Sequence, residues 1–283
     1  MAPQLEIIHQ AVKYIEDHLH LRVTIAEIAD KCGYSLYHFI RLFNKFTHHT
    51  PYDYLIRRRL STAYRDLENT RRTITDISFD YCFENPESFS RAFRRVFGLL
   101  PSDLRAGEPL QGTFPIPTKT LEDMAFTQRE DFTPPELVEV DEMVLTGLPV
   151  VLNRKNKLEE MAQIEQLRSM FGKYGIGIGS HLFSIFSFDA DPCQPGYLFS
   201  GIKTDSSSFF PPVCIQRIPF GLYARISYEE PCRRQALNYL LFTWLPGARM
   251  RMGHHFLMEE YHFDQDISAE RNIMVLVRNR RVL

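Results

Sequence analysis

The chain has 283 residues, with 33 Lys and Arg against 35 Asp and Glu, and a formal net charge of -2. Hydrophobic residues make up 44% and charged residues 24%, a globular composition that argues against wholesale disorder or a fibrous repeat. No apolar run approaches the ~18–20 residues that a membrane span requires, and the N-terminus lacks the pattern of a secretory signal. The length predicts two domains.

Cysteine usage indicates the compartment. The five cysteines are scattered and form no CxxC pair: Cys32, Cys82, Cys193, Cys214 and Cys232. This pattern is typical of a reducing cytoplasm and argues against a disulfide framework or a zinc module. We therefore expect a cytoplasmic protein with no metal, no cofactor and no membrane contact.

An internal repeat is the most informative feature of the first 107 residues. The segment TIAEIADKCGYSLYHFIRLFNKFTHHTPYDYL begins at Thr24, and TITDISFDYCFENPESFSRAFRRVFGLLPSDLR begins at Thr73. Both have the order Ile-Ile-aromatic, then Phe-x-Arg-x-Phe, then Pro. Chance rarely reproduces this order twice, so the two segments are expected to share one local structure.

Each copy predicts a helix, a tight turn and a second helix. Thr24 with Glu27 forms a capping box, and Thr73 with Asp76 is its weaker equivalent. Ser35 and Asn85 are expected to cap the second helices. Those helices carry an apolar stripe at helical spacing: Phe39, Leu42, Phe43 and Phe46 in the first, and Phe89, Ala92, Phe93 and Val96 in the second. A helix from about Pro51 to Leu67, with Leu55, Ala63 and Leu67 inward, joins the copies.

This arrangement is typical of helix-turn-helix DNA binding, whereas a single copy would equally fit a generic helical bundle. Arginines are locally concentrated at 57–59, at 71–72 and at positions 91, 94 and 95. Such clusters suit phosphate contacts, although a solvated helix face explains any one of them.

Residues 5–105 resemble the DNA-binding domain of AraC/XylS-type transcription regulators, which consists of two helix-turn-helix units joined by a long helix. The matching pieces are IAEIADKCGYSLYHFIRLFNKFT, PYDYLIRRRL and ITDISFDYCFENPESFSRAFRRVFGLLPSDLR. One departure is Cys82, where the family usually has Gly, and we expect it to tighten or strain the second turn. The resemblance implies an all-α domain over residues 1–107 whose partner is double-stranded DNA.

The resemblance also implies which residues face the DNA groove. In the first unit they are Ser35, Tyr37, Ile40 and Arg41, and in the second they are Glu87, Ser88 and Arg91, with Arg94 and Arg95 nearer the phosphates. Arginine can donate two hydrogen bonds to a guanine edge, and Tyr37 and Ile40 offer apolar contact to a thymine methyl. Glu87 either accepts from a cytosine amino group or is simply favoured by the helix dipole.

The second half alternates between strand and helix patterns after a Pro- and Gly-rich linker, placed at 108–124. Strands are expected at 136–151, 181–188 and 197–204, and a longer one at 213–228 with a kink at Pro219-Phe220-Gly221. Helices are expected at 158–171 and 231–245, and the last strands at 255–263 and 273–277. The order is strand–helix–strand–strand, twice, which predicts an α+β domain with helices packed on a sheet.

Residues 125–283 are similar to GyrI-like effector-binding domains. The matching marks are ELVEVDEMVLTGLPV, PFGLYARISYEEP, Trp244-Leu245-Pro246 and FLMEEYHF. Together the two domains resemble the arrangement of Rob-like regulators. The resemblance implies that the concave face of the sheet forms a pocket for a small organic molecule, often a hydrophobic cation.

In that family a glutamate on a late strand is the polar centre of the pocket, which by position is Glu259. Alternation along the strand leaves open whether Glu259 or Glu260 faces inward. Trp244 and Tyr228 are candidate aromatic contacts, because ring faces attract cations; as single aromatics they equally fit an ordinary core.

Motifs for catalysis are weak. No GxSxG, HExxH or GxxxxGK[ST] pattern appears, and the GIGIG run near residue 175 follows an expected helix rather than a strand. We therefore expect a transcription regulator, an activator with RNA polymerase as a partner, controlled by a small-molecule effector. Two alternatives stay open: a C-terminal domain that hydrolyses or sequesters a toxic compound, or one that binds no ligand and only contacts a protein.

Overall fold

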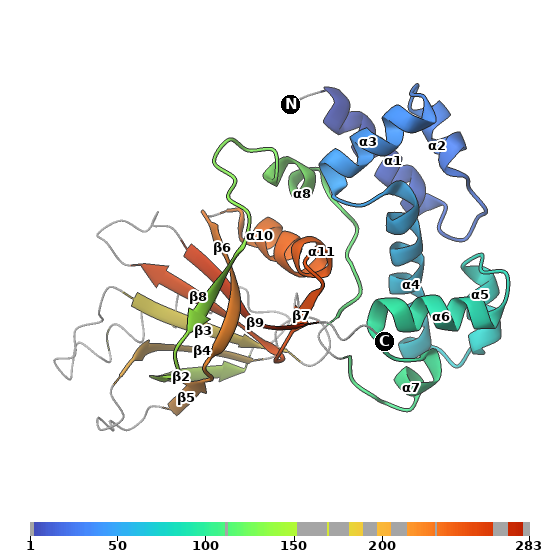
Figure 1. The fold of residues 1–283 in the computed structure, drawn as a ribbon. Coiled ribbons are helices and arrows are strands. Elements are labelled where there is room, and N and C mark those ends of the chain that lie inside the picture. The colour runs from blue at the N-terminus through green and yellow to red at the C-terminus, as the bar shows by residue number, and fades with distance from the viewer. Residues whose placement is uncertain are drawn as a thin grey trace. The chain divides into compact units, whose positions relative to one another are not determined.

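The computed structural model describes residues 3–110, 113–151, 169, 181–188, 197–204, 214–229, 231–262 and 271–279 (Figure 1). The chain divides into two compact units. The helical unit contains Met1–Phe132 and Leu241–Thr243, and the sheet unit contains Thr133–Leu240 and Trp244–Leu283. Among the described residues, every helix is too short or too polar to cross a bilayer.

Two helix-turn-helix units and a long joining helix build the helical unit. In chain order the helices are α1 Pro3–Asp17, α2 Ile25–Lys31, α3 Leu36–Thr47, α4 Pro51–Asn69, α5 Ile74–Asp80, α6 Pro86–Phe97, α7 Pro101–Arg105 and α8 Leu121–Phe126. In Figure 1, α4 runs from the group of α1, α2 and α3 to the group of α5, α6 and α7. The predicted pair of helix-turn-helix units is therefore confirmed.

The predicted capping residues start these helices. Thr24 and Glu27 form a reciprocal capping box on α2, and Thr73 and Asp76 form the equivalent box on α5. The Ser35 hydroxyl accepts from His38 N at 3.4 Å, and Asn85 Oδ1 accepts from Ser88 N at 2.8 Å. Because these side chains satisfy backbone N–H groups that a helix start leaves free, each boundary is fixed by local sequence.

The buried faces follow the predicted stripes. Phe39, Phe43, Phe89 and Phe93 are fully buried, and their rings contact each other in pairs within each copy. Ala92 is only half-buried, which differs from the expectation. The second stripe continues instead to Phe97, whose ring centroid lies 4.6 Å from that of Phe93. The repeat thus reflects two copies of one aromatic core.

The segment expected as a linker packs against the helical unit. Leu110, Phe114 and Ile116 are buried, and Ile116 N donates to Ser61 Oγ at 2.9 Å. Residues 121–126 then form α8, started by a capping box of Thr120 and Asp123. The boundary between the two units consequently lies at Phe132–Thr133 rather than within 108–124. Apolar residues inside a Pro-rich segment were the signal for this packing.

The sheet unit contains one curled antiparallel sheet. Its strands are β1 Glu136–Val140, β2 Met143–Val151, β3 His181–Ser187, β4 Tyr197–Lys203, β5 Cys214–Ile218, β6 Gly221–Tyr228, β7 Met250–Met252, β8 Phe256–His262 and β9 Arg271–Asn279. The strands lie in the order β1-β6-β9-β8-β3-β4-β2-β5, with β7 paired to β9. A continuous helical segment, made of α10 Arg233–Tyr239, a π-helix at Leu240–Trp244 and α11 Leu245–Gly247, precedes β7.

The strand order relates two halves of the sheet. On one side of the β3–β8 pair the order is β3-β4-β2, and on the other it is β8-β9-β6. Beyond these, β5 pairs with β2 and β1 pairs with β6, so each half receives its outer strand from the other half. Two long runs expected as single strands are each two strands, divided at Asp141-Glu142 and at Pro219-Phe220. The expected helix at 158–171 lies outside the described residues except for Ser169.

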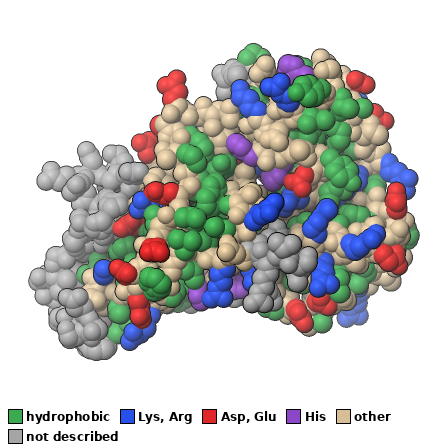
Figure 2. All heavy atoms as spheres, viewed as in Figure 1, with side chains coloured by type: hydrophobic (Ala, Val, Ile, Leu, Met, Phe, Trp, Pro, Cys, Tyr) green, Lys and Arg blue, Asp and Glu red, His purple; other side chains and the backbone are tan. Residues whose placement is uncertain are grey.

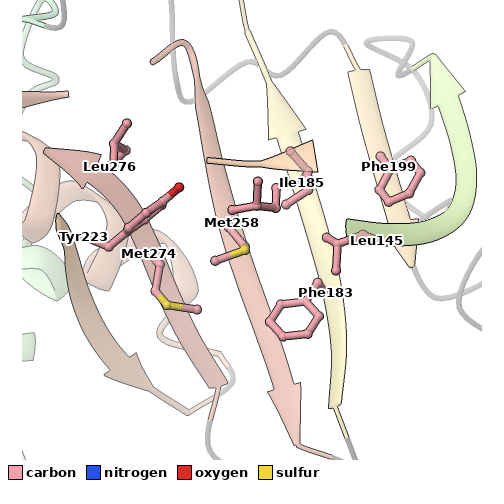
Figure 3. Packing of buried hydrophobic residues seen from close by; sticks show 9 residues of the cluster. Leu145, Phe183, Ile185, Phe199, Tyr223, Met258, Met274 and Leu276 are labelled. Carbon is pink, nitrogen blue, oxygen red and sulfur yellow. The ribbon is translucent and has the colours of Figure 1, made fainter. Parts of the chain in front are cut away.

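An apolar cluster fills one face of the sheet (Figure 3). Its members come from seven strands: Leu145, Phe183, Ile185, Phe199, Ile218, Tyr223, Met258, Met274 and Leu276. Cross-strand register places Ile185, Met258 and Met274 side by side. Since strand residues alternate between faces, the odd-numbered residues of β8 point to the opposite side.

The turn of the second helix-turn-helix unit is strained at Cys82. Its φ is 62°, in the left-handed region, whereas the corresponding turn of the first unit has Gly33 at φ 72°. A side chain in this region is disfavoured by ~1–2 kcal/mol, and the greater freedom of unfolded glycine offsets part of that. We expect Cys82→Gly to raise the free energy of unfolding by about 0.5–1 kcal/mol in urea denaturation.

Two controls separate backbone strain from side-chain effects. Cys82→Ala removes only the thiol and should change stability little. Gly33→Ala places a Cβ where no other atom lies within 4 Å, so a loss of about 1 kcal/mol there would come from the backbone alone. A Cys82→Gly variant that is less stable than Cys82→Ala would contradict the strain.

Candidate functional sites

The outer side of α3 carries the first set of expected groove residues. Ser35 is exposed at the helix start, Tyr37 is 73% exposed, and Arg41 is exposed one turn later. The Arg41 guanidinium lies 5.7 Å from the Tyr37 ring centroid, in a cation–π contact between the two exposed side chains. Ile40 is half-buried, so it offers less surface than expected.

A hollow of about 520 Å³ lies beside these side chains. Its lining residues are Gln4, Tyr37, His38, Arg41, Leu42 and Lys45. His38, whose ring stacks on Tyr34 at 4.8 Å, and Lys45 were not among the sequence candidates. Their spacing relative to Arg41, three before and four after, was the signal that places them on the same helix face.

The outer side of α6 carries the second set. Glu87, Arg91, Arg94 and Arg95 are exposed, and Ser88 is half-buried. The Ser88 hydroxyl donates to Asn85 O at 2.8 Å, which leaves its oxygen lone pairs for an incoming donor. A groove of about 650 Å³ beside them is lined by Tyr52, Ile56, Arg59, Cys82, Phe83, Glu84, Ser88, Arg91, Ala92 and Arg95.

Glu87 occupies the first turn of α6, where the helix dipole favours a carboxylate. It is also exposed on the same helix as Arg91. Both expectations for Glu87 are therefore compatible with its position, and neither is decided by it.

The run Arg57-Arg58-Arg59 does not form a phosphate-binding surface, so that interpretation of the cluster is wrong. Arg58 and Arg59 are each only 6% exposed. Arg58 Nη2 pairs with Glu16 Oε2 at 2.8 Å, while Arg59 donates to Leu19 O and Leu21 O at 2.9 and 2.6 Å. Consecutive helical residues point about 100° apart, so a run of three cannot share one solvent face.

Arg57 also forms an ion pair within the helical unit. Its Nε lies 2.7 Å from Asp53 Oδ2, which His49 Nδ1 contacts at 3.1 Å. Burial raises the pKa of the Asp53 carboxyl, but the hydrogen bond with His49 and the charge of Arg57 together lower it more, to about 2. Asp53 therefore remains a carboxylate partner for Arg57 at neutral pH.

The other basic clusters differ in their pairing. Arg71 and Arg72 are both exposed, but Arg72 pairs with Asp80 at 2.5 Å and its carbonyl accepts from Arg105 Nη2. On the face of the helical unit shown in Figure 2, basic and acidic side chains are interspersed. The exposed arginines of α6 are consequently the clearest group for phosphate contact.

In the sheet unit, Glu259 is 0% exposed and lies on the face opposite the apolar cluster. Its Oε2 accepts from Tyr261 OH at 2.8 Å and from Tyr228 OH at 3.2 Å. Arg233 Nη2 of α10 forms an ion pair with Oε1 at 2.6 Å. A buried carboxylate therefore has hydroxyl donors and a counter-ion within the chain.

Glu260 points to the other face, where it is partly exposed and accepts from Asn272 Nδ2 at 3.3 Å. The structure thus brings Glu259 and Tyr228 together. Trp244 is half-buried at the end of the π-helix. The sequence candidates missed Tyr261 and Arg233. Alternation was the signal for Tyr261, because it lies two residues after Glu259 on β8, whereas the pairing of Arg233 across α10 and β8 leaves no local pattern.

No group of three or more His, Cys, Asp or Glu side chains among the described residues is placed to hold a metal ion. The GIGIG run lies outside the described residues.

Two helix-turn-helix units on one chain, each with an exposed second helix and joined by one long helix, define a double helix-turn-helix DNA-binding domain. A helix-turn-helix domain family model matches residues 19–107. SoxS of Escherichia coli is 39% identical over 100 residues, which are 35% of this chain and 94% of that protein. AarP, a transcriptional activator of Providencia stuartii, is 31% identical over 105 residues, covering 37% of this chain and 78% of that protein.

Among solved structures, an AraC-type regulator from Chromobacterium violaceum is 26% identical, covers 38% of this chain and 95% of that chain, and has a TM-score of 0.35. The relationship to SoxS shows the family: the chain belongs to the AraC family of helix-turn-helix DNA-binding transcription regulators. The matched family model ends at residue 107, and the sheet unit lies beyond it.

Because Arg58 is buried, we expect its substitution to lower the stability of the fold rather than to remove a contact with DNA. Removing one partner of a buried ion pair leaves the other unpaired, so Arg58→Ala should lower the free energy of unfolding by about 3 kcal/mol in urea denaturation. Arg65 is exposed on the same helix, and Arg65→Ala should change stability by less than about 0.5 kcal/mol.

DNA binding supplies the complementary measurement. Arg94→Ala should reduce the salt dependence of binding by about one counter-ion, whereas Arg58→Met, which retains the apolar stem, should leave the slope unchanged at a temperature where it is folded. A reduced slope in Arg58→Met would return Arg58 to the phosphate-contacting group.

Proposed function

We propose that this regulator reads a specific DNA site through α3 and α6 together. The observation that carries the proposal is the matched exposure of Arg41 and Arg91, each two residues after a buried phenylalanine of its helix, Phe39 or Phe89. In this position a guanidinium can reach a guanine edge while the aromatic stripe stays in the core. Ser35, Tyr37 and Ile40 on α3 and Glu87 and Ser88 on α6 complete the groove-facing sets, and Arg94 and Arg95 contact phosphates.

The regulator acts as an activator in the cytoplasm, with RNA polymerase as its partner. Support comes from AarP, whose name describes a transcriptional activator and whose similarity spans 78% of its own length. An activator of this size can occupy a site without a second chain, because both recognition helices come from one domain.

The sheet unit is a GyrI-like effector-binding domain. Support comes from the matching strand orders of the two halves of the sheet, β3-β4-β2 and β8-β9-β6, and from the completely buried Glu259. The helix that the sequence predicts at 158–171 lies outside the described residues apart from Ser169. A small organic cation is the class of effector that a buried carboxylate with aromatic neighbours favours.

The groove assignment predicts the effect of two substitutions. Arg41→Ala and Arg91→Ala should each weaken specific DNA binding by ~1–3 kcal/mol, because each removes a bidentate donor to a base. Selection of bound sequences from a random pool should show relaxed preference at different positions in the two variants. Arg217, 73% exposed in the sheet unit, provides a matched control, and Arg217→Ala should leave affinity unchanged.

The ratio of specific to non-specific affinity decides this assignment. If both variants keep the wild-type ratio, Arg41 and Arg91 do not read bases. A uniform loss for all sequences would place them at phosphates instead.

The domain architecture predicts the stoichiometry of the complex. Two recognition helices on one chain can enter successive major grooves, which are ~34 Å apart on one face of the duplex. One chain should therefore protect roughly two turns of DNA, as measured by footprinting and by mass photometry of the complex. Two chains on the minimal site at every protein concentration would contradict it.

A further inference from the structure

The counter-ion of Glu259 belongs to the chain itself. An ionised carboxylate at 0% exposure is costly unless it is paired, and here Arg233 lies 2.6 Å away. The hydroxyls of Tyr228 and Tyr261 donate hydrogen bonds to the other carboxylate oxygen, Oε2. An incoming cation therefore meets a carboxylate that a guanidinium already occupies.

Arg233 approaches this carboxylate from the first turn of α10. Its side chain is 29% exposed, in contrast to the fully buried carboxylate, so it connects solvent with the site. The guanidinium carbon lies 4.6 Å from the ring centroid of Phe186, which shares the face of Glu259 in the β3–β8 register. The flat cation is thus placed between an aromatic face and a carboxylate oxygen.

The position of Arg233 in α10 favours its release. It is the first residue of the helix, where the helix dipole disfavours a cation. The N-cap residue, Cys232, makes no side-chain hydrogen bond to the helix start. Because Arg233 is already partly exposed, its long side chain can swing to water without unfolding the helix.

We propose that Arg233 is the resident occupant of the Glu259 site and that a cationic effector binds by exchanging with its guanidinium. The exchange rests on the effector-binding role proposed above, and it adds both the step of displacement and the shape of the ligand. The ligand class is a flat, delocalised cation, such as an aryl guanidinium or amidinium.

Two contacts of Arg233 define that shape. A planar cation can lie over Phe186 as the guanidinium does. It can also bring a nitrogen within 2.6 Å of the carboxylate oxygen, as Arg233 does. A quaternary ammonium cannot, since four carbon substituents surround its nitrogen.

Exchange has a measurable consequence. When a resident group fills a site in most molecules, the apparent affinity for an external ligand falls by the fraction of free sites. If Arg233 occupies the site about nine-tenths of the time or more, its removal should tighten binding of the external cation about tenfold or more.

The test uses phenylguanidinium as the probe and the full chain without DNA. Isothermal titration should show phenylguanidinium binding to Arg233→Ala about tenfold or more tightly than to the wild type. Phenylurea, its neutral analogue, and benzyltrimethylammonium, a cation without a flat charged group, should show no such gain. Arg234→Ala, which removes the next charge of the same helix, should behave like the wild type. Adding Glu259→Gln to Arg233→Ala should abolish the gain.

A second variant guards against misfolding. Arg233→Met removes the guanidinium but keeps an apolar stem near Phe186, so it should show the same direction of change if Arg233→Ala does not fold. Equal affinity of phenylguanidinium for the wild type and for the folded variant would overturn the exchange. So would an equal gain for phenylurea, because the vacated space rather than the carboxylate would then explain it.

These outcomes are distinct from failure of the proposed function. If wild type and variants bind phenylguanidinium equally well, the effector role stands while Arg233 is not the occupant. If none binds it, the exchange is overturned, and the DNA-reading role is still decided by Arg41→Ala and Arg91→Ala.

Discussion

The ion pair between Arg58 and Glu16 is the contact on which the helical unit depends. Arg58 lies in α4, the helix common to both helix-turn-helix units, and Glu16 lies near the end of α1. The same guanidinium donates to Ile116 O and Thr118 Oγ1, so it also fastens the segment that follows the second unit. Tyr54 OH adds a bond of 3.0 Å to Glu16. One buried cation thereby joins three parts of the chain that are distant in sequence.

This use of arginine explains where sequence reasoning succeeded and where it did not. Caps and apolar stripes act over three or four residues, and so Ser35, Asn85 and the phenylalanines predicted α3 and α6 correctly. The role of an arginine depends on what lies opposite it in space. Arg58 is buried and Arg91 is exposed, although both belong to runs of basic residues on amphipathic helices.

In the sheet unit, too, features set by neighbouring residues were predicted from the sequence, whereas features set by contacts distant in sequence were not. Strand positions followed from alternation, and Pro219-Phe220-Gly221 predicted a kink. That each long run forms two separate strands became clear only from pairing, because β5 pairs with β2 whereas β6 pairs with β1 and β9 in the other half of the sheet. Alternation likewise limited the inward residue of β8 to Glu259 or Glu260. The register with β3 and β9 places Met258 in the apolar cluster and hence Glu259 on the opposite face. That face, rather than the cluster side, carries the buried carboxylate.

Two buried ion pairs of this chain, Arg58–Glu16 and Arg233–Glu259, differ in how their cation is held. In the helical unit, Arg58 is held by a carboxylate and by a carbonyl oxygen at once, so no single competitor can replace its partners. At Glu259 the geometry is different: the hydroxyl donors are tyrosines fixed in strands, while the counter-ion comes from the partly exposed first residue of a helix. A pair is exchangeable when one member can reach water without disturbing the core, and Arg233 meets that condition whereas Arg58 does not. The same chemistry therefore fixes a fold in one unit and offers a replaceable contact in the other.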